Sequence, residues 1–163
     1  MRWEPLVAVE RSSLFPALRY HVVQMAMTPE VRESTRFLNV DLDIYSKTHL
    51  KPLVSALGKE VFALHQGREG RLWSAHLELS DQPRSADEAI RRLSALIRSL
   101  PPEARRLWDA AKIRDFNVGV QGGWKPHART VKLAPGTIRI ASSLKARLVV
   151  TIYAARAFSN PAQ

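Results

Sequence analysis

Two aspartates, Asp41 and Asp43, lie inside the stretch RFLNVDLDIYS (residues 36–46), which otherwise has the pattern of a β-strand. Apolar and polar residues alternate along it, and this period of two is typical of a strand with one buried face. Carboxylates on such a strand can coordinate Mg²⁺ or Mn²⁺, pair with basic groups, or simply face water. The elements that surround the two aspartates decide among these roles.

The segment after this strand predicts a short helix and a hairpin. THLKPLVSALG (residues 48–58) has apolar residues at helical spacing, and its final glycine is a natural stop. EVFALHQ (60–66) and RLWSAHLEL (71–79) have strand character, and the glycine-containing turn GREG (67–70) joins them. We therefore expect a helix followed by an antiparallel hairpin.

The C-terminal half predicts three helices and two strands. Ser85 and Glu88 have capping-box spacing at the start of one helix, and the pair Pro101–Pro102 separates it from a second. IRDFNVGVQ (113–121) alternates as a strand, APGTIRIASSLKA (134–146) predicts a helix, and RLVVTIYAA (147–155) predicts a closing strand.

The predicted order is β-α-β-β-α-α-β-α-β, which indicates an α+β fold. We expect a ferredoxin-like β-α-β-β-α-β core with an extra helix and a C-terminal strand, in a mostly antiparallel sheet. Residues 36–154 would form the single domain, with a short tail over 155–163. Residues 1–35 show no sustained period and are interpreted as a loosely ordered extension, or as a mis-assigned start preceding Met25 or Met27.

Composition excludes several classes of protein. The chain has no cysteine, so it has neither disulfides nor a thiolate nucleophile or metal ligand. No apolar run reaches the length of a membrane span, and the N-terminus lacks the apolar core of a secretory signal, so we expect a cytoplasmic protein. The net charge of +10 comes almost wholly from residues 86–163, which raises the possibility of a nucleic-acid partner, although arginine-rich solvated surfaces are commoner.

The predicted strand order gathers polar residues on one face of the sheet. In a ferredoxin-like sheet the strand order is fourth, first, third, second, which makes the three most polar strands neighbours. The helix-free face would then carry Asn39, Asp41, Asp43, Tyr45, Ser74, His76, Glu78, Asp115 and Asn117. Carboxylates on neighbouring strands repel, so we expect compensation by an arginine (Arg36, Arg114 or Arg147), by a basic partner or by a metal.

A second candidate region is the loop VQGGWKPHARTVKLAPG (residues 120–136). It is glycine-rich and basic and leads into a helix, but its spacing matches no phosphate-binding motif. We interpret it as a solvated loop at the rim of a binding surface. Its candidate contact residues are Trp124, Lys125, His127, Arg129 and Lys132.

These observations predict a non-enzymatic protein-binding module that acts without a cofactor, as a bacterial accessory, regulatory or immunity-type protein would. Its surface would centre on Asp41, Asp43, Tyr45, His76, Glu78, Asp115 and Asn117. One alternative is a phosphoester hydrolase that binds Mg²⁺ or Mn²⁺ through Asp41, Asp43, His76, Glu78 and Asp115. The other is a basic nucleic-acid-binding protein. The simplest interpretation is that this polar face is an ordinary solvated face of an antiparallel sheet with no binding role, and it remains an alternative to these three functions.

Overall fold

Strand β1 (Arg36–Ser46) is the middle of a five-stranded mixed sheet in the computed structural model, which describes residues 34–154. Four α-helices complete the α+β architecture, as the sequence predicts. The elements after β1 are α3 (Lys51–Leu57), η1 (Gly58–Glu60), β2 (Val61–Glu69), β3 (Leu72–Leu79), α4 (Ala86–Arg98), α5 (Pro102–Ala110), β4 (Ile113–Gln121), α6 (Pro135–Ser143) and β5 (Arg147–Tyr153).

The strand order across the sheet is β2-β3-β1-β4-β5. Strand β1 pairs antiparallel with β3 on one side and with β4 on the other, and β2 pairs antiparallel with β3. Strand β5 is parallel to β4, because the chain crosses over through α6 before it returns to the sheet. The sheet is therefore mixed, with a parallel pair at one edge.

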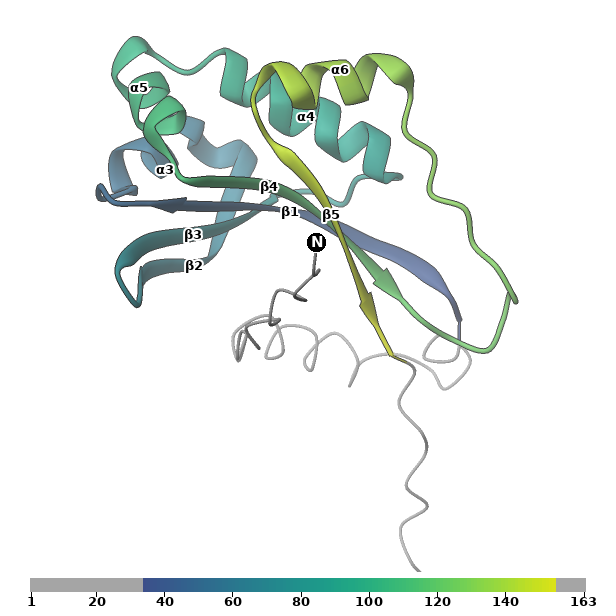
Figure 1. Cartoon of the computed structure of the whole chain (residues 1–163). Helices are drawn as coiled ribbons and strands as arrows, with labels where there is room; N and C mark the ends of the chain where they lie inside the picture. The colour runs from purple at the N-terminus through teal and green to yellow at the C-terminus, as the bar shows by residue number, and fades with distance from the viewer. Residues whose placement is uncertain (1–33, 155–163) are drawn as a thin grey trace, which may run out of the picture.

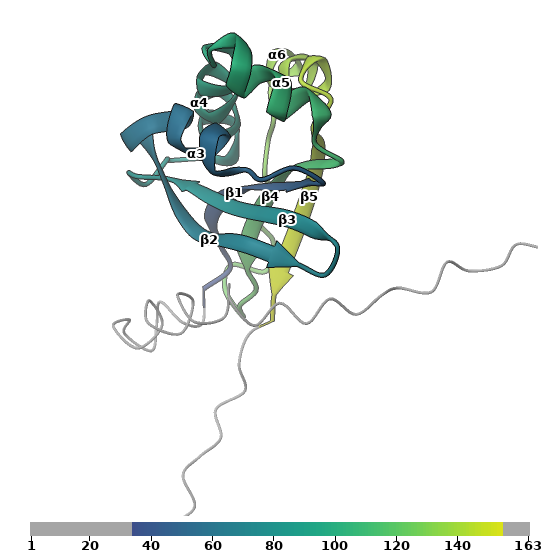
Figure 2. The same ribbon diagram turned by 90° about the vertical axis from the view of Figure 1, so that its left-hand side faces the viewer.

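The helices lie on one face of the sheet, as Figures 1 and 2 show. Below them the sheet arches, so that β2 and β3 bend down on one side and β5 descends on the other (Figure 1). No helix of residues 34–154 covers the underside of this arch (Figures 1 and 2). The helix-free face expected from the sequence is thus the concave face.

Local sequence explains where the central helices begin. Ser85 precedes α4, and its Oγ accepts a hydrogen bond from the Glu88 backbone N–H at 3.2 Å, as the capping-box spacing predicts. Helix α5 begins at Pro102, where a proline costs no intrahelical hydrogen bond. The two prolines therefore end one helix and start the next without a long connection.

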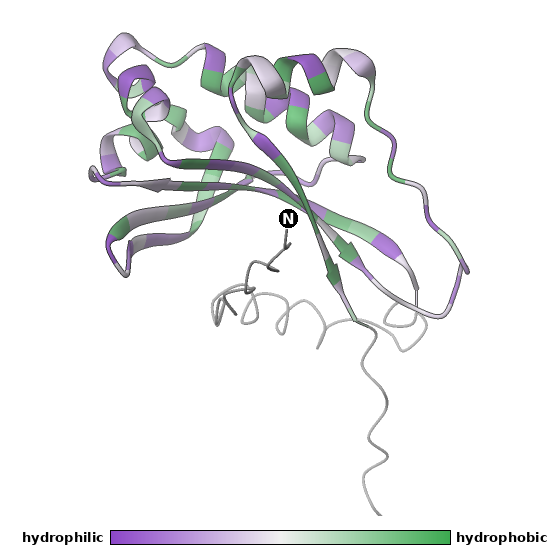
Figure 3. Cartoon of the chain, in the orientation of Figure 1, coloured by the Kyte–Doolittle hydropathy of each residue, from purple (hydrophilic) through white to green (hydrophobic). Residues whose placement is uncertain are grey.

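The core lies between the helices and the upper face of the sheet. Leu42 and Ile44 of β1, Phe116 of β4 and Trp108 of α5 are completely buried. Burial of each such side chain contributes about 1.5–3 kcal/mol. Figure 3 shows hydrophobic residues at intervals along the helices and strands on either side of this layer. Alternation along the strands leaves polar residues for the concave face.

The hairpin between β2 and β3 differs from the sequence-based expectation. Its turn consists of Gly70 and Arg71 alone, so that β2 extends to Glu69. Gly70 has φ of +60°, a conformation that glycine adopts without strain and that two-residue hairpin turns require. An irregularity between Ala63 and His65 also shifts the register of β2 and places His65 opposite His76.

Most of the predicted N-terminal extension (residues 1–35), including Met25 and Met27, lies outside the described residues, and so does the tail over 155–163. At the described start of the chain, Ser34 forms an isolated bridge with Lys125, and the Thr35 N–H donates to the Lys125 carbonyl at 2.8 Å. Among residues 34–154, no helix is long and apolar enough to cross a membrane.

Candidate functional site

The candidate site lies at the centre of the concave face, where β3, β1 and β4 run side by side. Asp43 of β1 is directly opposite His76 of β3 and, on its other side, directly opposite Asp115 of β4. Asp41 is opposite Asn117. The register therefore brings these predicted site residues onto neighbouring strands.

His76 is at the centre of a cluster of polar side chains. Its Nδ1 lies 2.7 Å from Asp43 Oδ1, and its Nε2 lies 3.0 Å from Glu69 Oε1. The Ser74 hydroxyl donates to the same Glu69 oxygen at 3.0 Å. The Tyr45 ring meets the imidazole edge-on at 5.5 Å between centroids, with its hydroxyl 3.5 Å from Nε2. One imidazole thus connects β1, β2 and β3.

The two flanking carboxylates determine the protonation state of His76. Burial by itself would lower its pKa, but the hydrogen bond and negative charge of Asp43, followed by those of Glu69, raise the pKa to about 9. At neutral pH the ring is therefore an imidazolium, and both ring nitrogens donate. Burial would raise the pKa of Glu69, but its hydrogen bonds to His76 and Ser74 lower it overall. The cluster is a positive ring held between two negative groups.

Amide side chains extend the hydrogen bonding toward β5. Asn117 donates through Nδ2 to Asp43 Oδ2 at 3.4 Å, and its Oδ1 accepts from the Thr151 hydroxyl at 2.8 Å. Asn39 donates through Nδ2 to Asp41 Oδ1 at 2.9 Å. Gly119 makes room for this amide, since a Cβ at that position would lie 2.5 Å from Asn39 Oδ1. Hydrogen-bonded side chains therefore occur on all five strands.

A bidentate ion pair compensates the carboxylate of Asp115. Arg147 of β5 donates through Nε and Nη2 to the two oxygens of Asp115, each at 2.7 Å. Arg147 is one of the arginines that the sequence suggested for this role. Arg114, another of them, instead donates to the backbone carbonyls of Trp108 and Asp109. Asp43 and Asp115 can therefore face each other because each has its own cation.

The concave face is more buried than a plain solvated face would be. Asp41, Ser74 and Asp115 are 9%, 0% and 6% exposed. The side chains of Asp43 and His76 are only 14% and 19% exposed, whereas Glu69 is 43% exposed. Carboxylates with so little access to water need hydrogen bonds and ion pairs within the protein.

The other predicted site residues lie apart from this cluster or at its margin. Glu78 is half-buried on β3, in register with Phe62. The loop residues Trp124, Lys125, His127, Arg129 and Lys132 are all exposed. The beginning of this loop is attached to Thr35, whose hydroxyl donates to the Gly123 carbonyl at 3.1 Å. Thr35 is eight residues before Asp43, or about 25 Å along a strand, so this attachment is far from His76.

Sequence reasoning missed Glu69 and His65, which both reach the cluster from β2. The sequence pattern places Glu69 in the turn, and the register shift near Ala63 that brings His65 to the face has no signature in the sequence. The His65 and His76 rings are 5.6 Å apart, and His65 Nε2 lies 3.6 Å from Glu69 Oε1. Glu69 could have been found by continuing the strand pattern through Gly67 and placing the turn at Gly70.

The geometry gives the metal-dependent alternative little support. Within residues 34–154, no group of three or more histidine, aspartate or glutamate side chains is arranged so that it could hold a metal ion. Asp115, one of the residues of that alternative, has both carboxylate oxygens engaged by Arg147.

Comparisons with known proteins assign the chain to no family. No protein-family model matches the chain, and no curated protein or solved structure shows significant similarity to it. Inference about function therefore depends on the geometry of the concave face.

Proposed function

We propose that this protein is a non-enzymatic binding module that recognises another protein with the concave face of its sheet. The observation that carries the proposal is the hydrogen-bonded array across that face, with His76 held by Asp43 and Glu69 at its centre. Side chains that are already fixed lose little conformational entropy when a partner binds, so such an array favours recognition. An accessory, regulatory or immunity-type role is compatible with this activity.

The chemistry of the array suggests what the partner presents. Asp115 is neutralised by Arg147, and His76 offsets one carboxylate of its pair, which leaves Glu69 as the most exposed acidic group of the cluster. Tyr45, half-buried beside His76, is an aromatic residue of the kind that anchors interfaces. We infer a partner surface that offers hydrogen-bond donors or a basic side chain to Glu69 and a pocket or an edge to Tyr45.

We further infer that β1 to β4, with α3 and α4, form a ferredoxin-like unit to which α6 and β5 are added. The position of β1 between β3 and β4, antiparallel to both, supports this classification. Fold alone does not define function, so the proposed activity rests on the concave face and not on the fold class.

The proposal can be tested by affinity capture with the full-length chain as bait. Four baits are compared on proteins from the source organism: the wild type, Tyr45→Ala, Glu69→Gln and a control, Arg98→Gln, at the exposed end of α4. We expect a partner that binds the wild type and the control but is lost with both face variants. After purification, calorimetry should show binding to the variants at least about tenfold weaker.

The outcomes of this comparison are distinguishable. Partners that bind all four baits equally would place the interface elsewhere and contradict the proposal, as would capture of no specific partner. Circular dichroism of each bait shows whether the variants remain folded, which separates loss of binding from loss of structure. A photo-crosslinker at position 45 should attach the partner, whereas one at position 98 should not.

A further inference from the structure

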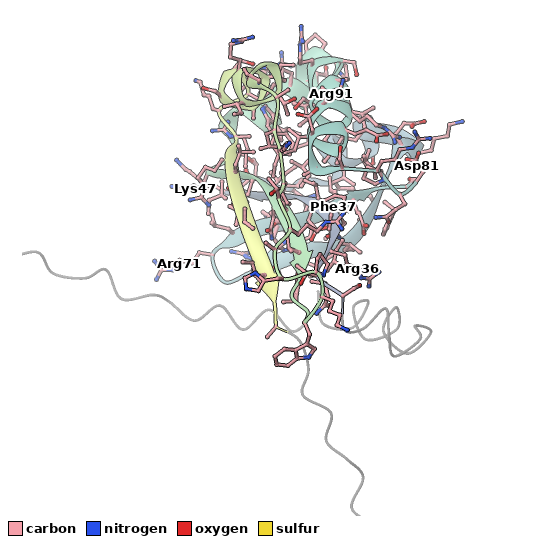
Figure 4. The ribbon with its side chains drawn as sticks, turned by 90° about the vertical axis from the view of Figure 1, so that its right-hand side faces the viewer. Arg36, Phe37, Lys47, Arg71, Asp81 and Arg91 are labelled. Atoms are coloured by element: carbon pink, nitrogen blue, oxygen red, sulfur yellow. The ribbon has the colours of Figure 1, made fainter. Side chains whose placement is uncertain are left out.

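The edge strand β5 exposes an apolar row that the concave face does not use. Leu148, Val150 and Ile152 are 40%, 60% and 71% exposed. They alternate along the strand, in register with Phe116, Val118 and Val120 of β4, and so lie on the helix side of the sheet. Figure 3 shows the hydrophobic colouring of β5, and Figure 4 views the molecule from the side on which β5 lies. Within residues 34–154, no strand pairs with its outer edge.

The backbone of the same three residues points outward. The Tyr153 carbonyl accepts a hydrogen bond from the Gly122 N–H at 2.7 Å, so Tyr153 directs its backbone groups toward β4. Because these directions alternate along a strand, Thr151 and Val149 also face β4, and Leu148, Val150 and Ile152 face away from it. The exposed edge therefore combines apolar side chains with backbone donors and acceptors in the same residues.

The residues of β5 are self-complementary about Val150. In an antiparallel pair of β5 strands from two copies, centred on Val150, Leu148 faces Ile152 of the other copy, Val149 faces Thr151, and Arg147 faces Tyr153. Apolar groups would meet apolar groups on the helix side, and Arg147 would lie beside an aromatic ring instead of another arginine. The outward backbone groups of Leu148, Val150 and Ile152 would then form about six hydrogen bonds.

The strand also lacks the features by which proteins usually protect an edge. It has no proline, no bulge in its pairing with β4, and no charged residue between Arg147 and Tyr153. Because the strand is unprotected, and because its charges, apolar residues and backbone groups are complementary to those of an antiparallel copy of itself, it is suited to pairing with β5 of a second chain.

We propose that two copies of this chain form a symmetric dimer by antiparallel pairing of their β5 strands, which joins the two sheets into one of ten strands. The two-fold axis passes beside Val150 and is perpendicular to the sheet, so both helix layers lie on the same side. The two concave faces then become one wider surface. This dimer does not depend on the proposed recognition of another protein.

Sedimentation velocity of the full-length chain over a range of concentrations tests the association. We expect the mass to rise from 18.4 kDa to twice that value as the concentration increases. Val150→Lys places two like charges next to each other at the two-fold axis and should abolish the dimer. The control, Gln66→Lys, introduces the same charge at an exposed position on the other edge strand, β2, and should leave the dimer intact.

Because the chain has no cysteine, single cysteines can test the register. In the proposed dimer, Val150 lies opposite Val150 of the other copy, at a Cα separation of about 5.5 Å that permits a disulfide. Val150→Cys should therefore crosslink on mild oxidation. Leu148→Cys, which is also exposed on the same strand, should not, because the two copies of position 148 are offset by about 13 Å along the strands, too far for a disulfide.

Three results would overturn the proposal. The first is a mass of one chain at every concentration, as expected if another segment of the chain or a different partner covers the edge. The second is a dimer that persists in Val150→Lys. The third is crosslinking of Leu148→Cys as fast as that of Val150→Cys, which would show random collision instead of the proposed pairing.

Discussion

The centre of the concave face and the edge strand β5 differ in how the sheet treats side chains: the centre shields charged groups from water, and the edge exposes apolar ones. At the centre, Asp115 is buried and Asp43 is half-buried, and each has a cation in contact. At the edge, Val150 and Ile152 are apolar and largely exposed. A polar group can be buried where neighbouring strands supply partners on both sides, whereas an edge strand has a neighbour on one side only. A residue's position across the sheet, more than its type, therefore decides whether neighbouring strands supply it with partners.

Removal of Asp43 should cause the largest loss of stability on the concave face. Asp43→Ala leaves the His76 imidazolium with a single carboxylate and leaves the Asn117 amide without its acceptor, so we expect the free energy of unfolding to fall by about 2–4 kcal/mol. Urea denaturation at pH 7 measures this change. Asp43→Asn, which keeps the shape and one hydrogen bond, should lose less. A loss below about 0.5 kcal/mol in Asp43→Ala would mean that the cluster is solvated.

The next effect is a decrease in stability with rising pH that depends on His76. Its pKa of about 9 in the folded protein exceeds the ordinary value of 6.5, so the stabilisation is complete below pH 6.5 and is lost as the pH rises through 9. The decrease should reach at most about 3 kcal/mol, and water near the partly exposed ring makes it smaller.

The measurement for this effect is urea denaturation at pH 6 and pH 9.5, for the wild type and for His76→Gln. The variant removes the titrating group but keeps a side chain that can donate to Asp43, so its stability should change less between the two pH values. If the free energy of unfolding changed equally between the two pH values in both proteins, His76 would not be charged at neutral pH.

Loss of the Arg147–Asp115 ion pair should have an intermediate effect, because it joins the two regions. The Arg147 side chain is 61% exposed, so its removal alone costs little burial. The Asp115 side chain is only 8% exposed and would remain without its cation. We expect Arg147→Ala to cost about 1–2 kcal/mol in urea denaturation. Arg147→Lys keeps the charge without the bidentate geometry and should recover only part of the loss. Full recovery would show that the geometry is unimportant.

Substitution at the β5 edge should have the smallest effect on the fold of a single chain. Ile152→Thr keeps a β-branched residue at a position that is 71% exposed, so we expect less than about 0.5 kcal/mol at concentrations low enough to keep the protein monomeric. The same substitution at Ile44, which is completely buried in the same sheet, provides the contrast and should cost far more. If Ile152→Thr cost as much as Ile44→Thr, the edge would be part of the core.

The sequence predicts the strands and the polar face because alternation is a local property. Leu42, Phe116 and their neighbours define the buried side of each strand, and this phase places Asp43 and Asp115 on the other side. The partners that satisfy these groups are less accessible to such reasoning. Glu69 depends on a two-residue turn, His65 on a shift in register, and the partner of Asp115 on a parallel strand that begins 32 residues later.

The exposed state of the β5 row could not be read from the sequence for a related reason. RLVVTIYAA has the apolar content of a buried strand, and only the arrangement of α6 and the strand order show that its helix-side residues are not covered. Local pattern gives the element, whereas the number of neighbours an element receives is decided by the whole fold.

The central position of β1 has a consequence for synthesis of the chain. Asp41 pairs with Asn117, which leaves the ribosome 76 residues later (117 − 41), so β1 waits roughly 4–15 s for its last neighbour at ordinary rates of translation. During that interval β1 lacks its β4 neighbour, and its apolar residues Val40, Leu42 and Ile44 lack part of their core. Because charged residues that interrupt an apolar segment reduce aggregation in general, we expect Asp41 and Asp43 to lower the tendency of β1 to aggregate before the sheet is complete.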